Sequence, residues 1–324
     1  MEICRQIVRV IFRQCLRIVV REKVIVSEGS GDMKKRIMNG FRPYKILIYL
    51  VLIVLAVSII IPVGWVFLAS IKENSEFYTN PWTLPKGVYF QNFIDAFTKA
   101  KMGSYFLNSI IVTGLAIVIL LIAALPAAYV LSRYKFIGRK ICNVMFMAGL
   151  FINVNYIVVP IFLMFVNADR ALKQWFGSGI FLNNLFMLAI VYAATALPFT
   201  IYLLSGYFVT IPKDYEEAAF VDGSGYFRTM VTIMMPMAKP SIITVILFNF
   251  LTFWNEYIIS MTLLTKDSKT LPVGLMQLMQ AQKSAANYGR LYAGLVIVML
   301  PTLILYMMVQ KKLTQGMSLG GLKG

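Results

Sequence analysis

Histidine is absent from the 324 residues, and cysteine is rare, with Cys4, Cys15 and Cys142 as its three members. Histidine is the commonest general base and metal ligand, so its absence weakens every interpretation of the chain as an enzyme or a metal protein. The three cysteines are isolated, and their spacing fits neither a disulfide framework nor a zinc site. The Walker A pattern, Gly-x-x-x-x-Gly-Lys-Ser/Thr, is also missing, so we expect no ATP hydrolysis by this chain alone.

Charged residues are also scarce: they make up 14% of the chain, whereas apolar residues make up 59% and the mean hydropathy is +0.74. Soluble globular proteins carry about 25% charged and about 45–50% apolar residues. We therefore predict a polytopic membrane protein rather than a series of soluble domains. The net charge of +17 does not favour nucleic acid as a partner, because no basic patch interleaved with aromatic residues is present.

Six apolar stretches are each long enough to cross a hydrocarbon core of about 30 Å, which takes roughly 20 residues of helix. Lipid offers the backbone no hydrogen-bond partners, so each span must be helical. We therefore predict an all-α fold with six transmembrane helices. Their centres are expected in Ile46–Ile71, Asn108–Leu131, Ile141–Val166, Leu185–Phe208, Ser241–Leu264 and Ala293–Gln310.

The spans form one membrane domain at residues 46–311, preceded by a basic segment at 1–45 and followed by a short tail at 312–324. In the first segment arginines recur every four residues, which on a helix makes a basic stripe typical of a membrane-surface helix. The other interpretation is that translation starts at Met33, because Met33-Lys34-Lys35-Arg36 is itself a short basic leader. We expect the start at Met33.

The distribution of Lys and Arg predicts the orientation. Twenty-one of these residues lie on one side of the predicted spans and ten on the other. The positive-inside rule then places both termini in the cytoplasm, together with the loop between the fourth and fifth spans. The larger group lies in 1–45, 132–140, 207–240 and 311–324, and the smaller group in 72–107, 167–184 and 264–291.

The loop at residues 211–240 is charged and amphipathic, and it separates two long apolar runs. Pro212 suits the first turn of a helix, because its missing N–H needs no partner there. Three acids, Asp214, Glu216 and Glu217, follow near the positive end of that helix. A short helix is therefore expected to begin at the start of the loop.

Gly223 is expected to end this helix, because glycine allows a left-handed backbone. Ser224 is then placed to cap a second helix, which we expect from about residue 225 to residue 235, ending against Pro236. The product is a short helix–turn–helix across the end of a membrane bundle. Such a shape suits docking into a groove of another protein.

The loop also carries a motif: Glu217-Ala218-Ala219, three residues, Gly223, nine residues, Ile233, one residue, then Met235-Pro236. This pattern resembles the EAA loop of bacterial ABC-importer permeases, with Met235 where the family usually has Leu. The resemblance implies that the loop is a coupling helix inserted into a cytoplasmic ATPase, with Glu217 paired to a basic residue and two alanines allowing close approach. The alternative is an ordinary amphipathic loop between two spans. The predicted coupling residues are Tyr215, Glu216, Glu217, Ala218, Ala219, Asp222, Gly223 and Pro236.

Glu256 is the acid that lies inside a predicted span, in Phe253-Trp254-Asn255-Glu256-Tyr257. An ionisable group in lipid costs at least about 2.5–3.5 kcal/mol at mid-depth, so Glu256 is expected to face protein or a water-filled path. A hydrogen bond to a neighbouring helix or to a partner is the alternative to direct contact with a solute, and interhelical bonding is the default for in-span asparagines. The candidate path residues are Asn153, Asn249, Asn255, Glu256 and Tyr257.

Three further stretches are similar to the carbohydrate-uptake branch of these permeases, specifically the second permease subunit of maltose-type importers: Trp254-Asn255-Glu256-Tyr257, Leu271-Pro272-Val273-Gly274-Leu275 and Gly320-Gly321-Leu322-Lys323-Gly324. The resemblance spans roughly residues 34–324. It implies a bacterial plasma membrane location and a complex with a second homologous permease, two cytoplasmic ATPases and an extracytoplasmic sugar-binding protein. Lys323 would contact the ATPases, which would use ATP and Mg²⁺, while this chain would bind no cofactor.

Two other functions stay open. A permease for another solute is the nearer one, although a polyamine path should show several acids and a phosphate path should show in-span Lys or Arg. A secondary transporter would need an ion-coupling network and usually an internal repeat, and neither is visible.

Overall fold

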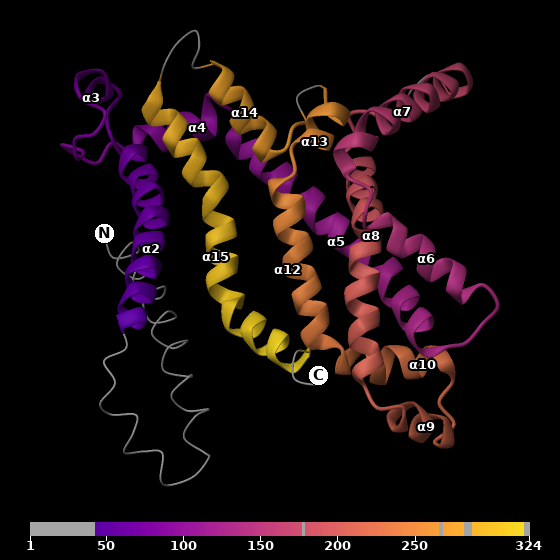
Figure 1. Ribbon diagram of the computed structural model, residues 1–324. Helices are drawn as coiled ribbons and strands as arrows, with labels where there is room; N and C mark the ends of the chain where they lie inside the picture. Colours follow the sequence, from indigo (N-terminus) through magenta and orange to yellow (C-terminus); the bar gives the residue numbers. More distant parts are fainter. Residues whose placement is uncertain (1–42, 177–178, 266–267, 282–286, 321–324) are drawn as a thin grey trace, which may run out of the picture. The chain divides into compact units, whose positions relative to one another are not determined.

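The computed structural model describes the backbone of residues 43–176, 179–265, 268–281 and 287–320, which form helices and loops with no strand among them (Figure 1). The expected start at Met33, the arginine stripe before it and Lys323 lie outside these residues. The chain divides into two units, residues 1–89 and 90–324. Each unit is described by itself.

The first unit contains α2 (Pro43–Ser70) and the short helix α3 (Asn74–Thr79). α2 is apolar along its length, and its segment Leu47–Ser70 is long enough to cross a membrane, which confirms the first predicted span. None of its most apolar stretch is buried within the first unit. Such a helix needs lipid or other membrane helices against its surface.

Lys72 fixes the loop that follows α2. The residue is fully buried, and its Nζ donates hydrogen bonds to the carbonyls of Asn80, Pro81 and Thr83 at 3.0, 3.2 and 3.0 Å. An ammonium group can donate three such bonds, so the buried charge is compensated by backbone oxygens. The loop therefore closes back on the end of its own span.

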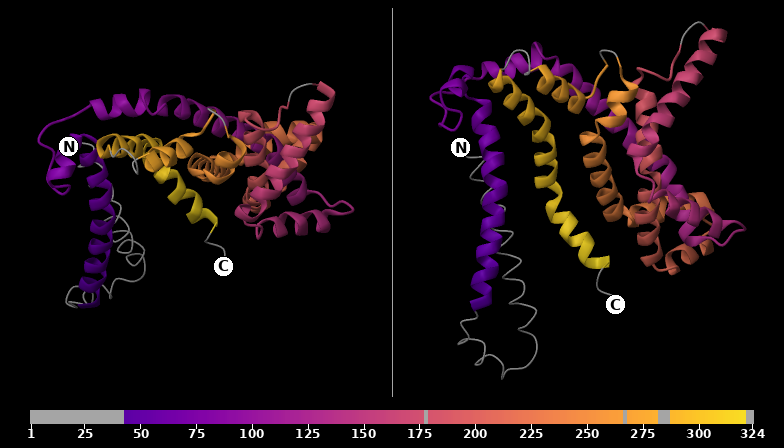
Figure 2. Two further views of the ribbon diagram at one scale, coloured as in Figure 1. Left: turned by 90° about the horizontal axis from the view of Figure 1, so that it is seen from above. Right: turned by 45° about the horizontal axis from the view of Figure 1, so that its top comes forward.

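The second unit is built around the packing of α5 on α8, which lie side by side (Figures 1 and 2). Its main core takes buried side chains of α5 from Val112 to Leu131 and of α8 from Leu188 to Phe208. The helices of this unit are α4 (Gln91–Thr98), α5 (Met102–Arg133), α6 (Arg139–Gly149), α7 (Val154–Phe176), α8 (Leu185–Thr210), α9 (Asp214–Val221), α10 (Tyr226–Thr229), the π-helical turn η1 (Met230–Met234), α11 (Met235–Met237), α12 (Lys239–Asn255), α13 (Ile258–Leu263), α14 (Leu271–Ala281) and α15 (Tyr288–Gly320).

Five helices in the described part of the chain are long and apolar enough to cross a membrane: α2, α5, α7, α8 and α15. A sixth span exists if the segments 226–237 and 239–255, bent by 75° at residue 238, count as one. The predicted all-α membrane fold is thereby confirmed. The predicted second, fourth and sixth spans lie within α5, α8 and α15, and the predicted first span runs one residue past the end of α2.

The third span was predicted wrongly as one helix over 141–166, because the helix breaks between α6 and α7. Gly149 ends α6, and the Asn153 side-chain oxygen accepts the N–H of Asn155 at 3.0 Å, so Asn153 caps the start of α7. α6 has 11 residues, about 16 Å at 1.5 Å per residue, which is too short to span. The spanning helix is therefore α7, and this shift brings Asp169 into a span.

The fifth span was also predicted too long. α12 ends at Asn255, and Glu256 has an extended backbone with φ −73° and ψ 126°. The Glu256 carboxylate accepts the N–H groups of Ile259 and Ser260 at 2.8 and 3.1 Å. The first N–H groups of a helix have no partner within the helix, so the Glu256 side chain stabilises the start of α13. The sequence had predicted one continuous span across this position.

Candidate functional site

The loop between α8 and α12 carries the predicted coupling residues, and it lies at the opposite end of α8 from α13 (Figure 1). Its first helix, α9, begins at Asp214 and has three acids in its first turn, as predicted. Acids there interact favourably with the positive helix end. The local sequence chemistry therefore accounts for the position and start of α9.

Gly223 ends α9 in the predicted left-handed conformation, with φ +80°. The N–H of Ser224 donates to the carbonyl of Ala219 at 2.9 Å, and the N–H of Gly223 donates to Phe220 at 3.0 Å. These two bonds form the Schellman motif, which satisfies carbonyls at the end of a helix. The turn prediction is confirmed.

The second half of the loop differs from the prediction. Ser224 does not cap α10: Gly225 is the N-cap residue and no side chain caps the helix there, while the Ser224 hydroxyl accepts a bond from Thr229 Oγ1 at 3.2 Å. The helix also continues past Pro236 to Met237. A proline lacks an N–H and crowds the preceding turn, and the π-helical turn at Met230–Met234 widens that turn just before it.

Most predicted coupling residues face outward. Tyr215, Glu217, Ala218, Asp222, Gly223 and Pro236 are exposed. Apolar side chains share this surface, with exposed fractions of 87% for Val221 and 75% for Phe227. Glu216 and Ala219 are the buried residues of α9, so these two side chains contact this chain rather than a partner.

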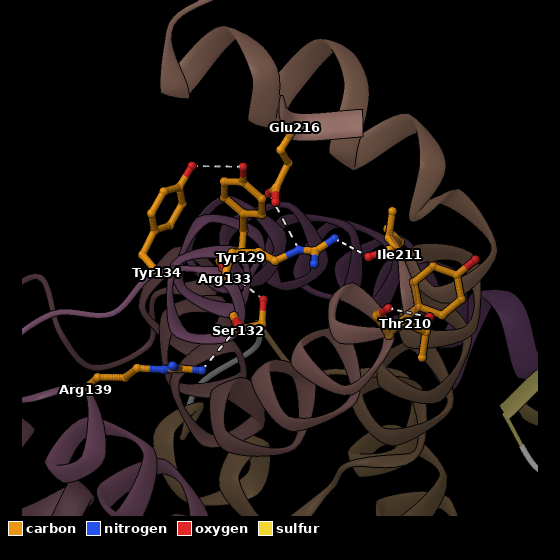
Figure 3. Close-up of polar contacts among 9 residues, drawn as sticks. Tyr129, Ser132, Arg133, Tyr134, Arg139, Thr210, Ile211 and Glu216 are labelled. Carbon is orange, nitrogen blue, oxygen red and sulfur yellow. Dashed lines mark hydrogen bonds and ion pairs between the residues drawn. The ribbon is translucent and has the colours of Figure 1, made fainter. Parts of the chain in front are cut away.

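Glu216 belongs to a charged cluster at the end of α5, shown in Figure 3. Arg133, the last residue of α5, places its Nε 3.6 Å from Glu216 Oε1, and the two side chains are 6% and 11% exposed. The same guanidinium donates to the carbonyl of Ile211, the residue that caps α8. The ring of Tyr129 lies beside Glu216, and its hydroxyl is bonded to that of Tyr134 at 3.1 Å. One arginine therefore joins the ends of α5 and α8 to α9.

The sequence alone did not reveal Arg133 as a site residue, because it counted only as one of four basic residues in the loop 132–140. The sequence does contain two features that could have indicated this pair: an arginine at the end of an apolar span, and two adjacent acids, Glu216 and Glu217. Adjacent residues point to different faces of a helix, so one acid of such a pair can be exposed while the other is buried. That acid then needs a cationic partner.

The candidate path residues lie on α12 and beside the breaks in the helices. Glu256 Oε2 accepts the hydroxyl of Tyr192, from α8, at 2.7 Å. Asn249 is buried and donates to Thr200 Oγ1 at 3.0 Å, which is the interhelical bonding expected as the default. Glu256 therefore faces protein, as predicted.

The other path candidates are exposed. Asn255 donates to the carbonyl of Leu251 at 2.8 Å, as a side chain folded back on its own helix. Tyr257 is 39% exposed. Asn153 lies inside the predicted third span, but in the structure it precedes α7 and caps its first turn. The structure therefore brings Asn255, Glu256 and Tyr257 together at one helix break and leaves Asn153 and Asn249 elsewhere.

Comparison with known proteins gives a consistent answer. Residues 119–318 match the family "Binding-protein-dependent transport system inner membrane component". The diacetylchitobiose uptake system permease protein NgcG of Streptomyces coelicolor is 34% identical, and the alignment covers 86% of this chain and 89% of that protein. The melibiose/raffinose/stachyose import permease protein MelC of Bacillus subtilis is 29% identical, with 86% of this chain and 96% of that protein covered. The maltodextrin transport system permease protein MalD of Streptococcus pneumoniae is 28% identical over 91% of this chain and 99% of its own.

A solved structure agrees with these relatives. It is the crystal structure of a bacterial ABC transporter involved in the import of the acidic polysaccharide alginate, with a TM-score of 0.69, 25% identity, and coverage of 83% of this chain and 96% of the matched one. The resemblance to ABC-importer permeases inferred from the loop motif is thereby confirmed. The chain is a multi-pass membrane protein, and it belongs to the family of inner membrane components of binding-protein-dependent transport systems.

Proposed function

We propose that this chain is the permease subunit of an ATP-driven importer for a sugar or oligosaccharide, and that it forms half of the path. The observation that carries the proposal is the loop 211–240, in which Gly223 adopts the left-handed turn and Glu217 and Ala218 face outward from α9. The similar proteins support a sugar as the solute, because they are named as permeases for diacetylchitobiose, for melibiose, raffinose and stachyose, and for maltodextrin.

The proposed complex contains a second homologous permease, two cytoplasmic ATPases and an extracytoplasmic sugar-binding protein in the bacterial plasma membrane. α9 enters a cleft of an ATPase, with Glu217 against a basic residue there, and Lys323 adds a contact from the tail. ATP and Mg²⁺ are held by the ATPases rather than by this chain. Both termini and the loop are cytoplasmic, as the excess of Lys and Arg on that side supports.

In the proposed cycle, ATP closes the ATPases and pulls on α9, which turns a cavity shared with the second permease from inward- to outward-facing. ATP drives this change because it binds the two states with different affinity. Asn255 and Tyr257 are the best placed of the candidates to contact the solute or the second permease, because they are exposed where α12 ends. Glu256 lies between them, and its carboxylate accepts bonds from Tyr192, Ile259 and Ser260, so it supports this region rather than presenting a free acid.

A permease for a polyamine or an amino acid is the alternative, and the named relatives do not favour it. A polyamine path requires several free acids. The corrected third span adds Asp169, but its two carboxylate oxygens accept the N–H groups of Phe181 and Leu182 at 2.8 and 3.0 Å. That carboxylate is therefore committed to the backbone. A secondary transporter finds no support in this family.

The test is reconstitution of the native complex. The chain is tagged and purified in detergent, its partners are identified by mass spectrometry, and the complex is placed in vesicles with its binding protein. ATP-dependent uptake is measured for labelled diacetylchitobiose, raffinose and maltodextrin, and for spermidine and glutamine as controls. Uptake of a sugar supports the proposal. Uptake of spermidine or glutamine alone, or co-purification without any ATPase, would overturn it.

A further inference from the structure

α9 is attached to the rest of the chain in an unusual way. A surface helix normally packs by a stripe of apolar side chains. The buried side chains of this eight-residue helix are instead those of Glu216 and Ala219. Alanine offers little area, so α9 is held by the carboxylate of Glu216 and by the ring of Phe220, which is 38% exposed and contacts Tyr226 with 5.0 Å between centroids.

The partner of this carboxylate connects three elements. Arg133 ends α5, its guanidinium donates to the carbonyl of Ile211 at the end of α8, and its Nε lies 3.6 Å from Glu216 Oε1 on α9. Figure 3 shows the guanidinium between the other two groups. A displacement of α9 therefore acts on the ends of two transmembrane helices at once. These are the two helices whose packing forms the main core.

The Arg133 guanidinium makes two different contacts, a hydrogen bond to the Ile211 carbonyl and an ion pair with Glu216. A charge-assisted N–H···O bond is about 2.7–2.9 Å long, whereas the separation in the ion pair is 3.6 Å. Neither Arg133 Nε nor Glu216 Oε1 has a hydrogen-bond partner within the described residues, and both atoms are buried. Such a link keeps its attraction while the angle between the two groups changes.

We propose that the Arg133–Glu216 ion pair is the joint that passes movement of α9 to α5 and α8, with Arg133 as a positioning residue. The proposal rests on the proposed function, because it takes α9 as the element that the ATPases move. Without the joint, α9 keeps its chain connections and the ring contact of Phe220 with Tyr226, but it loses its charged link to the ends of α5 and α8. The ATPases can then grip α9 and hydrolyse ATP with less movement of the path.

Three variants test the joint. Arg133→Lys keeps the positive charge but removes the planar fork that reaches both Ile211 and Glu216. The double variant Arg133→Glu with Glu216→Arg restores opposite charges between α5 and α9, although a glutamate at position 133 cannot donate to the Ile211 carbonyl. Arg139→Lys is the matched control, since that guanidinium lies at the same end of α5 but donates to two carbonyls of α5 itself, at 2.8 and 3.2 Å.

The first measurement is labelled sugar imported per ATP hydrolysed by the complex in vesicles. We expect Arg133→Lys to co-purify with the ATPases but to import less sugar per ATP by about fivefold or more, the lower end of usual coupling between sites. The reversed pair should recover at least half of the loss, and Arg139→Lys should match the wild type. An unchanged ratio in Arg133→Lys would overturn the joint, as would a reversed pair no better than Arg133→Lys.

The second measurement does not depend on the solute. Spin labels at Asp214, the exposed first residue of α9, and at Val209 on α8, which is 63% exposed, report the distance between these helices with and without ATP. We expect one narrow distance in the wild type and a broader, ATP-dependent distribution in Arg133→Lys. Identical distributions would overturn the joint. If the wild-type complex imports no sugar, the proposed function fails while this measurement still decides the joint.

Discussion

Replacing Gly223 by valine is the sharpest test of the loop, because the structure separates its backbone effect from crowding. Gly223 has φ +80°, and a Cβ built there meets no atom within 4 Å in the described part of the chain. The substitution therefore creates no clash with neighbours. What remains is the cost of an L-residue in the left-handed region, about 1–2 kcal/mol and at the upper end for a β-branched side chain.

A free-energy change of 1–2 kcal/mol lowers the population of the native turn by a factor of about 5–30 relative to its competitors. The Schellman bonds to Ala219 and Phe220 are lost when the turn rearranges, so α9 is aimed differently toward its ATPase. The effect should not extend to the transmembrane core, because Gly223 is exposed in the turn between α9 and α10. We expect an inserted, folded permease with weakened ATPase binding and reduced uptake.

Gly225 supplies the control. It lies two residues away, its Cβ would also meet open space, but its backbone is extended with φ −74° and ψ 164°. Valine adopts that conformation readily. Gly225→Val should therefore retain ATPase co-purification and uptake, and Gly223→Asn should lie between the two, since asparagine tolerates the left-handed region. Equal loss in both valine variants would show that side-chain bulk, rather than backbone conformation, is responsible.

Three other substitutions probe separate features. Glu217→Lys changes an exposed side chain, so the free energy of unfolding should change by less than about 0.5 kcal/mol, while uptake and ATPase co-purification are lost. Normal uptake would show that Glu217 is not part of the interface. Glu256→Gln keeps an acceptor for the Tyr192 hydroxyl but removes the negative charge. We expect normal assembly of the complex, with lower sugar uptake or an altered dependence of uptake on sugar concentration. Unchanged uptake would contradict this prediction. Lys72→Met removes the donor to the carbonyls of Pro81 and Thr83, at about 1 kcal/mol each, while the Asn80 carbonyl keeps the Thr83 hydroxyl as a donor. The melting temperature should therefore fall, and an unchanged value would refute this account of the loop.

The parts of the fold that the sequence predicted depend on local chemistry. Gly223 indicates its turn because the left-handed region is closed to most other residues. The acids of α9 indicate a helix start for a similar local reason. Long apolar stretches predict spans because lipid leaves the backbone no alternative to a helix. Each of these signals needs only neighbouring residues.

The parts that it missed depend on where an apolar helix breaks. Hydropathy treats α6 and the start of α7 as one stretch, although Asn153 caps a new helix between them. It likewise runs through Glu256, whose carboxylate starts α13. Arg133 was missed because its partner Glu216 is distant in sequence and each residue has an ordinary local explanation. A single sequence carries no signal for that pairing beyond the presence of opposite charges.

Four charged side chains in the described part of the chain bond to backbone groups near helix ends. Lys72 donates to carbonyls after α2, Asp169 accepts N–H groups beyond α7, Glu256 accepts those at the start of α13, and Arg133 donates to the carbonyl that follows α8. Backbone groups near helix ends lack intrahelical partners, so they can compensate these charges. Arg133 differs from the others because it also faces an opposite charge, Glu216, on a separate helix. A charge that satisfies only the backbone fixes a helix end in place. A charge that also holds a second helix transmits force between the two, and for this reason Arg133 is the buried charge that bears on coupling.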